Sequence, residues 1–183
     1  MEDLYKTEPA PIKPTVLRYA LIGSLILIAF SLVSQLTGLT THSSWAVRTS
    51  TSLVSIVIMF LVFRSAIISY RDQENEGLVT LGKGFMITFW ITLIMAAVST
   101  VFFIIMVTYI DSSVIDFARE EAITDMESKG MSDEEIDQAM GFAEFFMSPA
   151  FFAIAAFFAT VFLGAIIGLV TAIIYKKEVP VKL

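Results

Sequence analysis

Four long apolar runs, separated by shorter polar segments, account for most of the chain. They cover residues 19–39, 46–70, 85–110 and 149–175. A bilayer core about 30 Å thick needs about 20 mostly apolar helical residues, so each run is long enough to cross it with some tilt. The pattern predicts an all-α membrane protein, with a mobile tail at residues 1–18 and a single four-span domain at residues 19–183.

The polar segment at residues 111–148 is the longest interruption between two apolar runs. Its first helix is expected to begin near Ser112 or Ser113 and to end at Gly130. Ser132, followed three residues later by Glu135, forms a capping box that begins a second helix. The chain is therefore expected to carry a two-helix extramembrane insertion between spans three and four, which either caps the outer ends of the spans or lies flat on the membrane.

Basic residues concentrate on one side of the predicted spans. Nine would lie on the side of the termini and three on the other side. Because lysine and arginine favour the cytoplasmic side, both termini are expected in the cytoplasm, and the chain in the cell inner (plasma) membrane. The nine are Lys6, Lys13, Arg18, Arg64, Arg71, Lys83, Lys176, Lys177 and Lys182, and the three are Arg48, Arg119 and Lys129.

Small residues recur every four positions along two of the spans, which lets helix backbones approach closely in lipid. The fourth span carries Ala156, Thr160, Gly164, Gly168 and Ala172. The third span carries Thr88, Thr92, Ala96 and Thr100. These nine residues are the candidate helix-packing positions, and the two faces are expected to contact each other. The GxxxG step within the fourth span also leaves open a homodimer face.

Composition narrows the chemistry that the chain can perform. Hydrophobic residues make up 56% and charged residues 16% of the sequence, and the mean hydropathy is +0.79. Cysteine is absent and His42 is the one histidine, which excludes thiolate metal sites, cysteine nucleophiles and multi-histidine metal centres. Ser43 and Ser44 adjoin His42, but sequence neighbours rarely form a catalytic dyad. We expect no enzyme activity, no cofactor and no resident metal.

The acidity of the chain belongs to one segment. Residues 111–144 contain eleven acidic and two basic residues, whereas the whole chain has a net charge of −6. The run Asp133-Glu134-Glu135-x-Asp137 lacks the spacing and central glycine of an EF-hand loop, so a solvated acidic face is expected in place of a calcium site. No basic cluster with interleaved aromatics supports nucleic-acid binding.

Uncharged polar residues gather toward the outer side of the first two spans. Gln35 is expected to cluster with hydroxyls at 49–52 and with Ser55, as structural glue. None of the four runs contains Asp or Glu, whereas proton pumps and ion-coupled carriers usually place an ionisable group near the midplane. The leading hypothesis is a non-enzymatic role in association with the lipid bilayer and with a second copy or an envelope protein. The alternative is a small transporter or channel subunit acting as an oligomer.

Several short motifs, in this order and spacing, resemble a family of small bacterial membrane proteins of unknown function, DUF4199. The resemblance implies four spans in the inner membrane with an outer helical insertion, and it implies no activity and no site. The motifs are Tyr70-Arg71-Asp72 with a following glycine, Thr80-Leu81-Gly82-x-Gly84-Phe85, Gly130-Met131-Ser132-x-Glu134-Glu135, Phe146-Met147-Ser148-Pro149, and Gly164-x-x-x-Gly168 before Lys176-Lys177.

Overall fold

The computed structural model describes residues 10–39 and 44–178, which form helices joined by turns. Four of the helices are long and apolar enough to cross a membrane, which confirms the predicted all-α membrane class. The elements are α1 (Lys13–Leu36), α2 (Trp45–Ser69), the short π-helix η2 (Tyr70–Glu74), α3 (Leu81–Tyr109), α4 (Ser113–Ser128), α5 (Asp133–Ala143) and α6 (Pro149–Tyr175).

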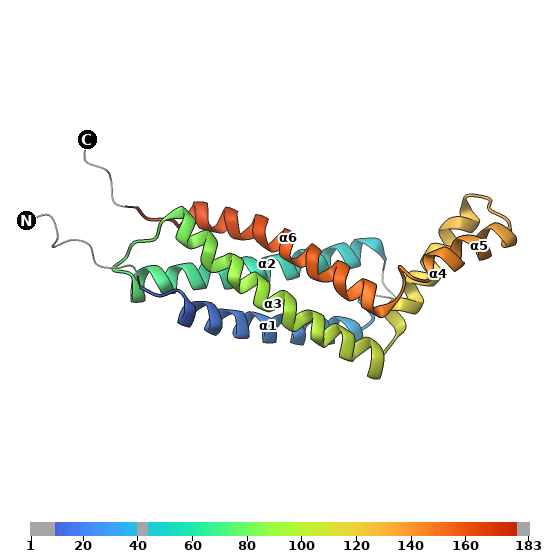
Figure 1. Cartoon of the computed structure of the whole chain (residues 1–183), viewed down its shortest axis with the longest axis horizontal. Coiled ribbons are helices and arrows are strands. Elements are labelled where there is room, and N and C mark those ends of the chain that lie inside the picture. The colour runs from blue at the N-terminus through green and yellow to red at the C-terminus, as the bar shows by residue number, and fades with distance from the viewer. Residues whose placement is uncertain (1–9, 40–43, 179–183) are drawn as a thin grey trace, which may run out of the picture.

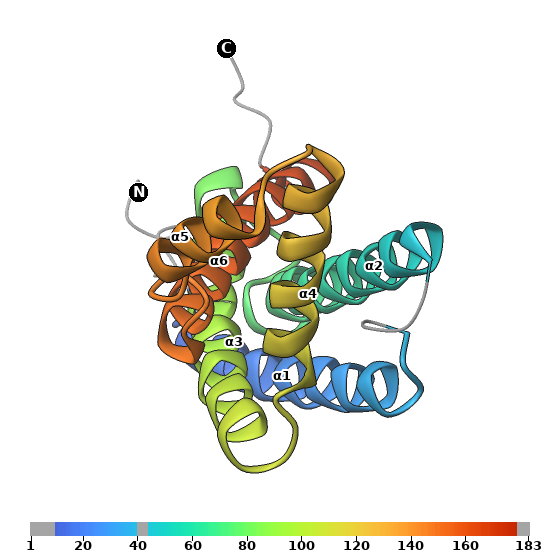
Figure 2. The ribbon, with the colours of Figure 1, turned by 90° about the vertical axis from the view of Figure 1, so that its right-hand side faces the viewer.

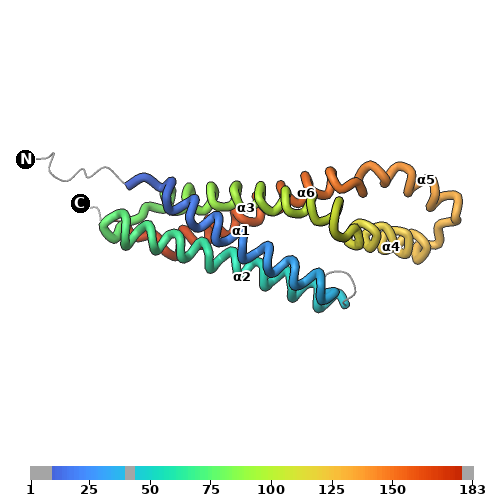
Figure 3. Tube along the Cα trace, turned by 90° about the horizontal axis from the view of Figure 1, so that it is seen from below, coloured from blue at the N-terminus to red at the C-terminus, as the bar shows by residue number. Residues whose placement is uncertain are grey.

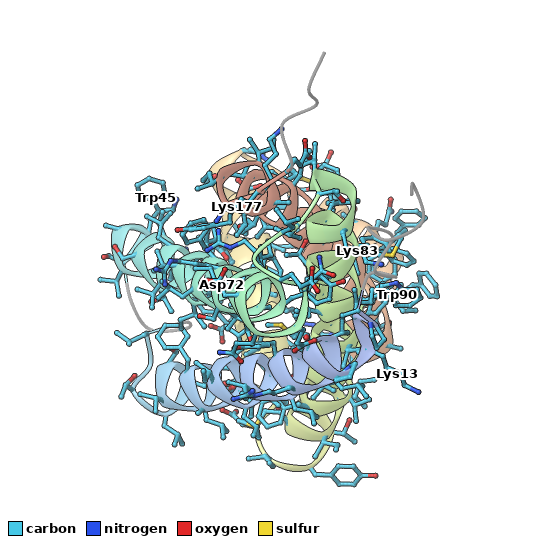
Figure 4. The ribbon with its side chains drawn as sticks, turned by 90° about the vertical axis from the view of Figure 1, so that its left-hand side faces the viewer. Lys13, Trp45, Asp72, Lys83, Trp90 and Lys177 are labelled. Carbon is cyan, nitrogen blue, oxygen red and sulfur yellow. The ribbon has the colours of Figure 1, made fainter. Side chains whose placement is uncertain are left out.

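The four long helices form an elongated bundle, and α4 and α5 project beyond one end of it (Figure 1). We call this the hairpin end, and the opposite end, where α1 begins and α6 finishes, the terminal end. Figure 4 looks at the terminal end, where Lys13, Asp72, Lys83 and Lys177 surround the helix ends. The halves of the bundle next to these ends are the terminal half and the hairpin half.

Two helices begin earlier than the apolar pattern predicts. Helix α1 begins at Lys13, with Pro14 in its first turn. Proline is tolerated there because backbone amides of the first turn have no carbonyl partner within the helix. Thr15 and Val16 are buried, so residues 13–18 of the expected tail belong to the packed helix, and residues 1–9 lie outside the described residues. Helix α3 begins at Leu81 because the Thr80 side chain caps it by accepting from the Lys83 amide.

The hydrophobic core occupies the terminal half. Its large members Phe63, Ile67, Ile87 and Ile91 have no exposed surface, and they come from α2 and α3. Helix α1 adds Val16 and Ala20, and α6 adds Ile167 and Ala172 in the same half. The four helices therefore close on one another over the turns nearest the terminal end.

Hydrogen bonds between distant segments of the chain hold the terminal end together. The Tyr70 hydroxyl donates to the Ala10 carbonyl at 2.7 Å, and the Thr15 hydroxyl lies 2.5 and 2.6 Å from the two carboxylate oxygens of Glu74. Val79 and Lys177 exchange backbone hydrogen bonds of 2.9 Å, which joins the segment before α3 to the segment after α6. Segments from the beginning, middle and end of the chain thus meet in one network.

The hairpin half is more open. Viewed from below, the α1–α2 pair diverges from the α3–α6 pair toward the hairpin end (Figure 3). Figure 2 looks at that end and shows α4 crossing in front of the bundle. Long-range polar contacts cross the opening: the Gln35 amide donates to the Asp111 carboxylate at 3.1 Å, and Arg48 pairs with Glu121 of α4 at 3.0 Å.

Candidate functional site

Helices α3 and α6 form the closest helix contact in the bundle, and threonines of α3 meet glycines of α6 there. A Cβ added at Gly164 would lie 2.4 Å from Thr92 Cγ2, and one at Gly168 would lie 2.5 Å from Thr88 Oγ1. Since real Cβ atoms do not approach so closely, only glycine fits at these two positions. Nearer the terminal end, a Cβ at Gly84 would lie 3.3 Å from Ala172 Cβ.

The same two rows of small residues separate toward the hairpin end. Ala96 and Thr100 of α3, with Ala156 and Thr160 of α6, line a cavity of about 200 Å³ between these helices and α1. Of the nine predicted packing residues, the structure thus brings Thr88, Thr92, Gly164, Gly168 and Ala172 into the tight half of the contact and leaves these four on the cavity wall.

A second cavity of about 440 Å³ adjoins the first, and both are lined by Leu27, Ser31, Ser99 and Thr160. We call the two together the hairpin-half cavity. Its apolar wall comprises Leu27, Ile28, Phe30, Ile56, Met59, Phe102, Phe103, Met106 and Leu163. Its polar wall comprises Ser31, Ser34, Gln35, Thr51, Ser52, Ser55, Ser99, Thr100 and Thr160.

The cavity hydroxyls of α1, α3 and α6 differ from those of the terminal half in what they bond. In the terminal half, Ser24 donates to the Ala20 carbonyl at 2.8 Å and Thr171 to the Ile167 carbonyl at 2.7 Å. In the cavity, Ser34 is 1% exposed, and its hydroxyl has no hydrogen-bond partner within residues 10–39 and 44–178. The hydroxyls of Ser31, Ser99, Thr100 and Thr160 likewise make no hydrogen bond to another described residue. The cavity therefore has unused hydrogen-bonding capacity.

Gln35 lies on the cavity wall, but its hydrogen-bond partner is not the one expected from the sequence. Its amide bonds to Asp111, just after α3, whereas Thr51, Ser52 and Ser55 of α2 donate to carbonyls of their own helix. An ionised carboxylate is a stronger acceptor than a hydroxyl, which favours this partner. His42, the one histidine, lies outside the described residues.

The α4–α5 hairpin is the second feature of this end. Its helices α4 and α5 contact each other, α4 also contacts α3, and Ile136 is the one buried residue within α4 and α5. A groove of about 270 Å³ lies between the two helices, with Ile123 and Met140 among its apolar residues and Arg119, Asp137 and Glu144 among its charged ones. Hydrogen bonds from the Ser132 amide and hydroxyl lower the pKa of Glu135 and complete the capping box.

Arg48 of α2 joins the hairpin to the bundle by two contacts. Arg48 pairs with Glu121, and its guanidinium also lies 5.1 Å from the centre of the Phe117 ring. Within residues 10–39 and 44–178, no group of three or more histidine or acidic side chains is arranged to hold a metal ion. The acidic residues of the hairpin are thus spread over a surface in place of converging on a point.

Sequence reasoning missed the cavity itself. Serines such as Ser31, Ser34 and Ser99 are common in membrane spans, because a serine hydroxyl can donate to a carbonyl of its own helix at little cost in lipid. Their presence in the sequence therefore does not indicate a cavity. The available signal was that four-residue spacing of small residues continues past Ala96 and Gly164 toward the hairpin end. Spacing alone does not reveal where two helices separate.

Comparison of the sequence with known proteins and family models shows to which protein family the chain belongs. Neither the curated proteins nor the solved structures include a match to this chain. A family model described as a protein of unknown function (DUF4199) matches residues 18–177. That span runs from the first turns of α1 to the end of α6, and it includes both the cavity and the hairpin. The chain is therefore a multi-pass membrane protein with four helices long enough to span the membrane, and it belongs to the DUF4199 family.

Proposed function

We propose that this protein is a non-enzymatic component of the cell inner (plasma) membrane that holds an envelope protein through its α4–α5 hairpin. The termini would lie in the cytoplasm and the hairpin outside. The basic side chains at the terminal end, including Lys13, Lys83 and Lys177, support this orientation, because lysine and arginine favour the cytoplasmic side (Figure 4).

One observation carries the proposal: the hairpin extends beyond the bundle instead of covering it (Figure 1). A loop that served only to join α3 to α6 would not need two helices with a groove between them. The groove joins apolar Ile123 and Met140 to the carboxylates of Asp137 and Glu144. Arg119 of the same groove lies 3.7 Å from the Glu144 carboxylate, which leaves the Asp137 carboxylate as the acidic group there that is unpaired among the described residues. A protein surface that presents a basic side chain within an apolar patch fits this combination.

Charge favours a different protein over a second copy as the partner. Residues 111–144 contain eleven acidic and two basic residues, so two hairpins brought together would repel each other. A basic envelope protein would be attracted to the same surface. The attraction would also weaken with salt, because dissolved ions screen interactions between exposed charges beyond about 10 Å at 0.1 M ionic strength.

Site-directed crosslinking in native membranes tests the proposal, and the absence of cysteine allows single-cysteine variants. A photocrosslinker at Met140→Cys should capture one envelope protein, and Asp137→Asn with Glu144→Gln should weaken the capture severalfold. The same label at Ser128→Cys, outside the groove, is the positional control. His42→Ala should leave the capture unchanged. Capture of a second copy alone, or an adduct that ignores both charge and salt, would contradict the proposal.

The hairpin-half cavity favours a second candidate, a small transporter or channel subunit acting as an oligomer. Against a path through one chain, Phe63, Ile67 and Ile91 fill the terminal half without exposed surface. A path would therefore have to form between copies. Solute or ion flux into vesicles containing the purified protein, lost when the cavity is filled by Thr160→Leu, would support this candidate over the first.

A further inference from the structure

We propose that the hairpin-half cavity binds a neutral amphiphile, a lipid-like molecule with an apolar chain and an uncharged headgroup that carries hydroxyl or ester groups. This goes beyond the proposed function, because it concerns a site within the bundle and does not depend on the hairpin. The site is formed by α1, α2, α3 and α6 where the two helix pairs diverge (Figure 3).

Ser34 supplies the first step of the argument. A buried polar group without a partner costs about 1–3 kcal/mol, and a serine in a helix can avoid this by bonding the carbonyl one turn earlier. Ser24, ten residues earlier in α1 and 2% exposed, bonds in that way. Ser34 does not, and it lines the larger cavity. Turning about its Cα–Cβ bond would bring this buried, unpartnered hydroxyl to a molecule inside.

The walls specify the chemistry of that molecule. The described residues that line the two cavities include no Asp, Glu, Lys, Arg or His. A charged headgroup would be taken from water without a partner and at high cost. Serine and threonine hydroxyls together with the Gln35 amide donate to and accept from uncharged groups. They therefore match alcohol and ester oxygens.

The apolar part of the wall favours a hydrocarbon chain over water beside it. Ile56, Met59, Phe103 and Leu163 give water no hydrogen bonds, and a stable buried water needs about two to four polar partners. An acyl or isoprenoid chain gains by contact with these side chains. The divergence of the α1–α2 pair from the α3–α6 pair gives such a chain a route from the bilayer (Figure 3).

The test uses the full-length protein in lipid nanodiscs doped with a diacylglycerol that carries a diazirine in its acyl chain. A phosphatidylglycerol with the same chain is the matched charged probe. Mass spectrometry after irradiation should map diacylglycerol adducts preferentially to Ile56, Met59 and Phe103. The phosphatidylglycerol should label outward-facing residues such as Leu53 and Val101, which are 56% and 58% exposed.

Two matched pairs of variants sharpen the test. Ser34→Ala should reduce cavity labelling roughly fivefold, as expected for one lost hydrogen bond, whereas Ser24→Ala should not change it. Thr160→Leu, which fills the cavity, should abolish the labelling, whereas Ala159→Leu, at an exposed position of α6, should leave it intact. Thermal unfolding of each variant verifies the fold, and Thr160→Leu decides the matter if Ser34→Ala does not fold.

Equal labelling of the cavity by both probes would overturn the neutral headgroup. Adducts confined to outward-facing residues with both probes, as for a cavity that holds only water, would overturn the site as a whole. Cavity labelling that survives Thr160→Leu would contradict the assignment of the wall.

Discussion

The terminal and hairpin halves of the bundle are built from the same four helices, yet they use their small and hydroxyl-bearing residues differently. In the terminal half, Thr88 and Thr92 press against glycines and return their hydrogen bonds to their own helix. In the hairpin half, Ser34 and Ser99 face a cavity without a protein partner among the described residues. Serine and threonine therefore pack helices together where a glycine lies opposite them. Where no glycine lies opposite, the same residue types line a cavity.

Gly164→Ala should have the largest effect on stability, because it disrupts the last tight contact between α3 and α6 before the cavity. The added methyl would collide with Thr92, whose branched, buried side chain cannot move aside. We expect a loss of about 1–3 kcal/mol in the free energy of unfolding, typical of an overpacked core. Thermal or denaturant unfolding in detergent measures it.

The double variant Gly164→Ala with Thr92→Ala should recover most of the loss, since the methyl then has room. Gly82→Ala, which meets nothing within 4 Å, is the control and should be neutral or slightly stabilising. A Gly164→Ala variant as stable as the parent would mean that α3 and α6 are not in close contact.

Tyr70→Phe should have a smaller effect, confined to the terminal end. It removes the hydrogen bond from the buried hydroxyl to the Ala10 carbonyl, at a cost of about 0.5–1.5 kcal/mol. Hydrogen exchange should accelerate at the beginning of α1 and remain unchanged around the cavity. Tyr109→Phe, at a ring that is 80% exposed, is the control. Equal acceleration in both halves would show that they are not independent.

The smallest effect is a pH dependence limited to the hairpin. Ser132 lowers the pKa of Glu135, so the stabilisation is complete above the ordinary glutamate pKa of about 4.3 and is lost as pH falls through the depressed folded value. Exchange at α5 amides, corrected for its intrinsic pH dependence, should rise over that acid range. Glu135→Gln should remove this rise, and a rise that persists in the variant would have another origin.

The sequence predicts much of this fold, for reasons that differ between elements. Apolar run length is sufficient to locate four spans, and Ser132 with Glu135 locates the start of α5. The start of α1 is harder to place, because Lys13 and Pro14 suggest a polar tail. The hydrogen bond that fixes this turn joins Thr15 to Glu74, 59 residues away, so the local sequence does not reveal it. The cavity was not predictable, because the angle at which helices diverge is set by contacts along their whole length.

The central claim is that the bundle closes at Thr92 and is open at Ser99, two helical turns further along α3. Leucine at each position, compared by thermal unfolding in the same detergent, tests it most directly. We predict that Thr92→Leu is strongly destabilised, because leucine would collide with Gly164, and that Ser99→Leu is as stable as the parent or more so, because leucine fills the cavity. Equal destabilisation at the two positions would contradict the account.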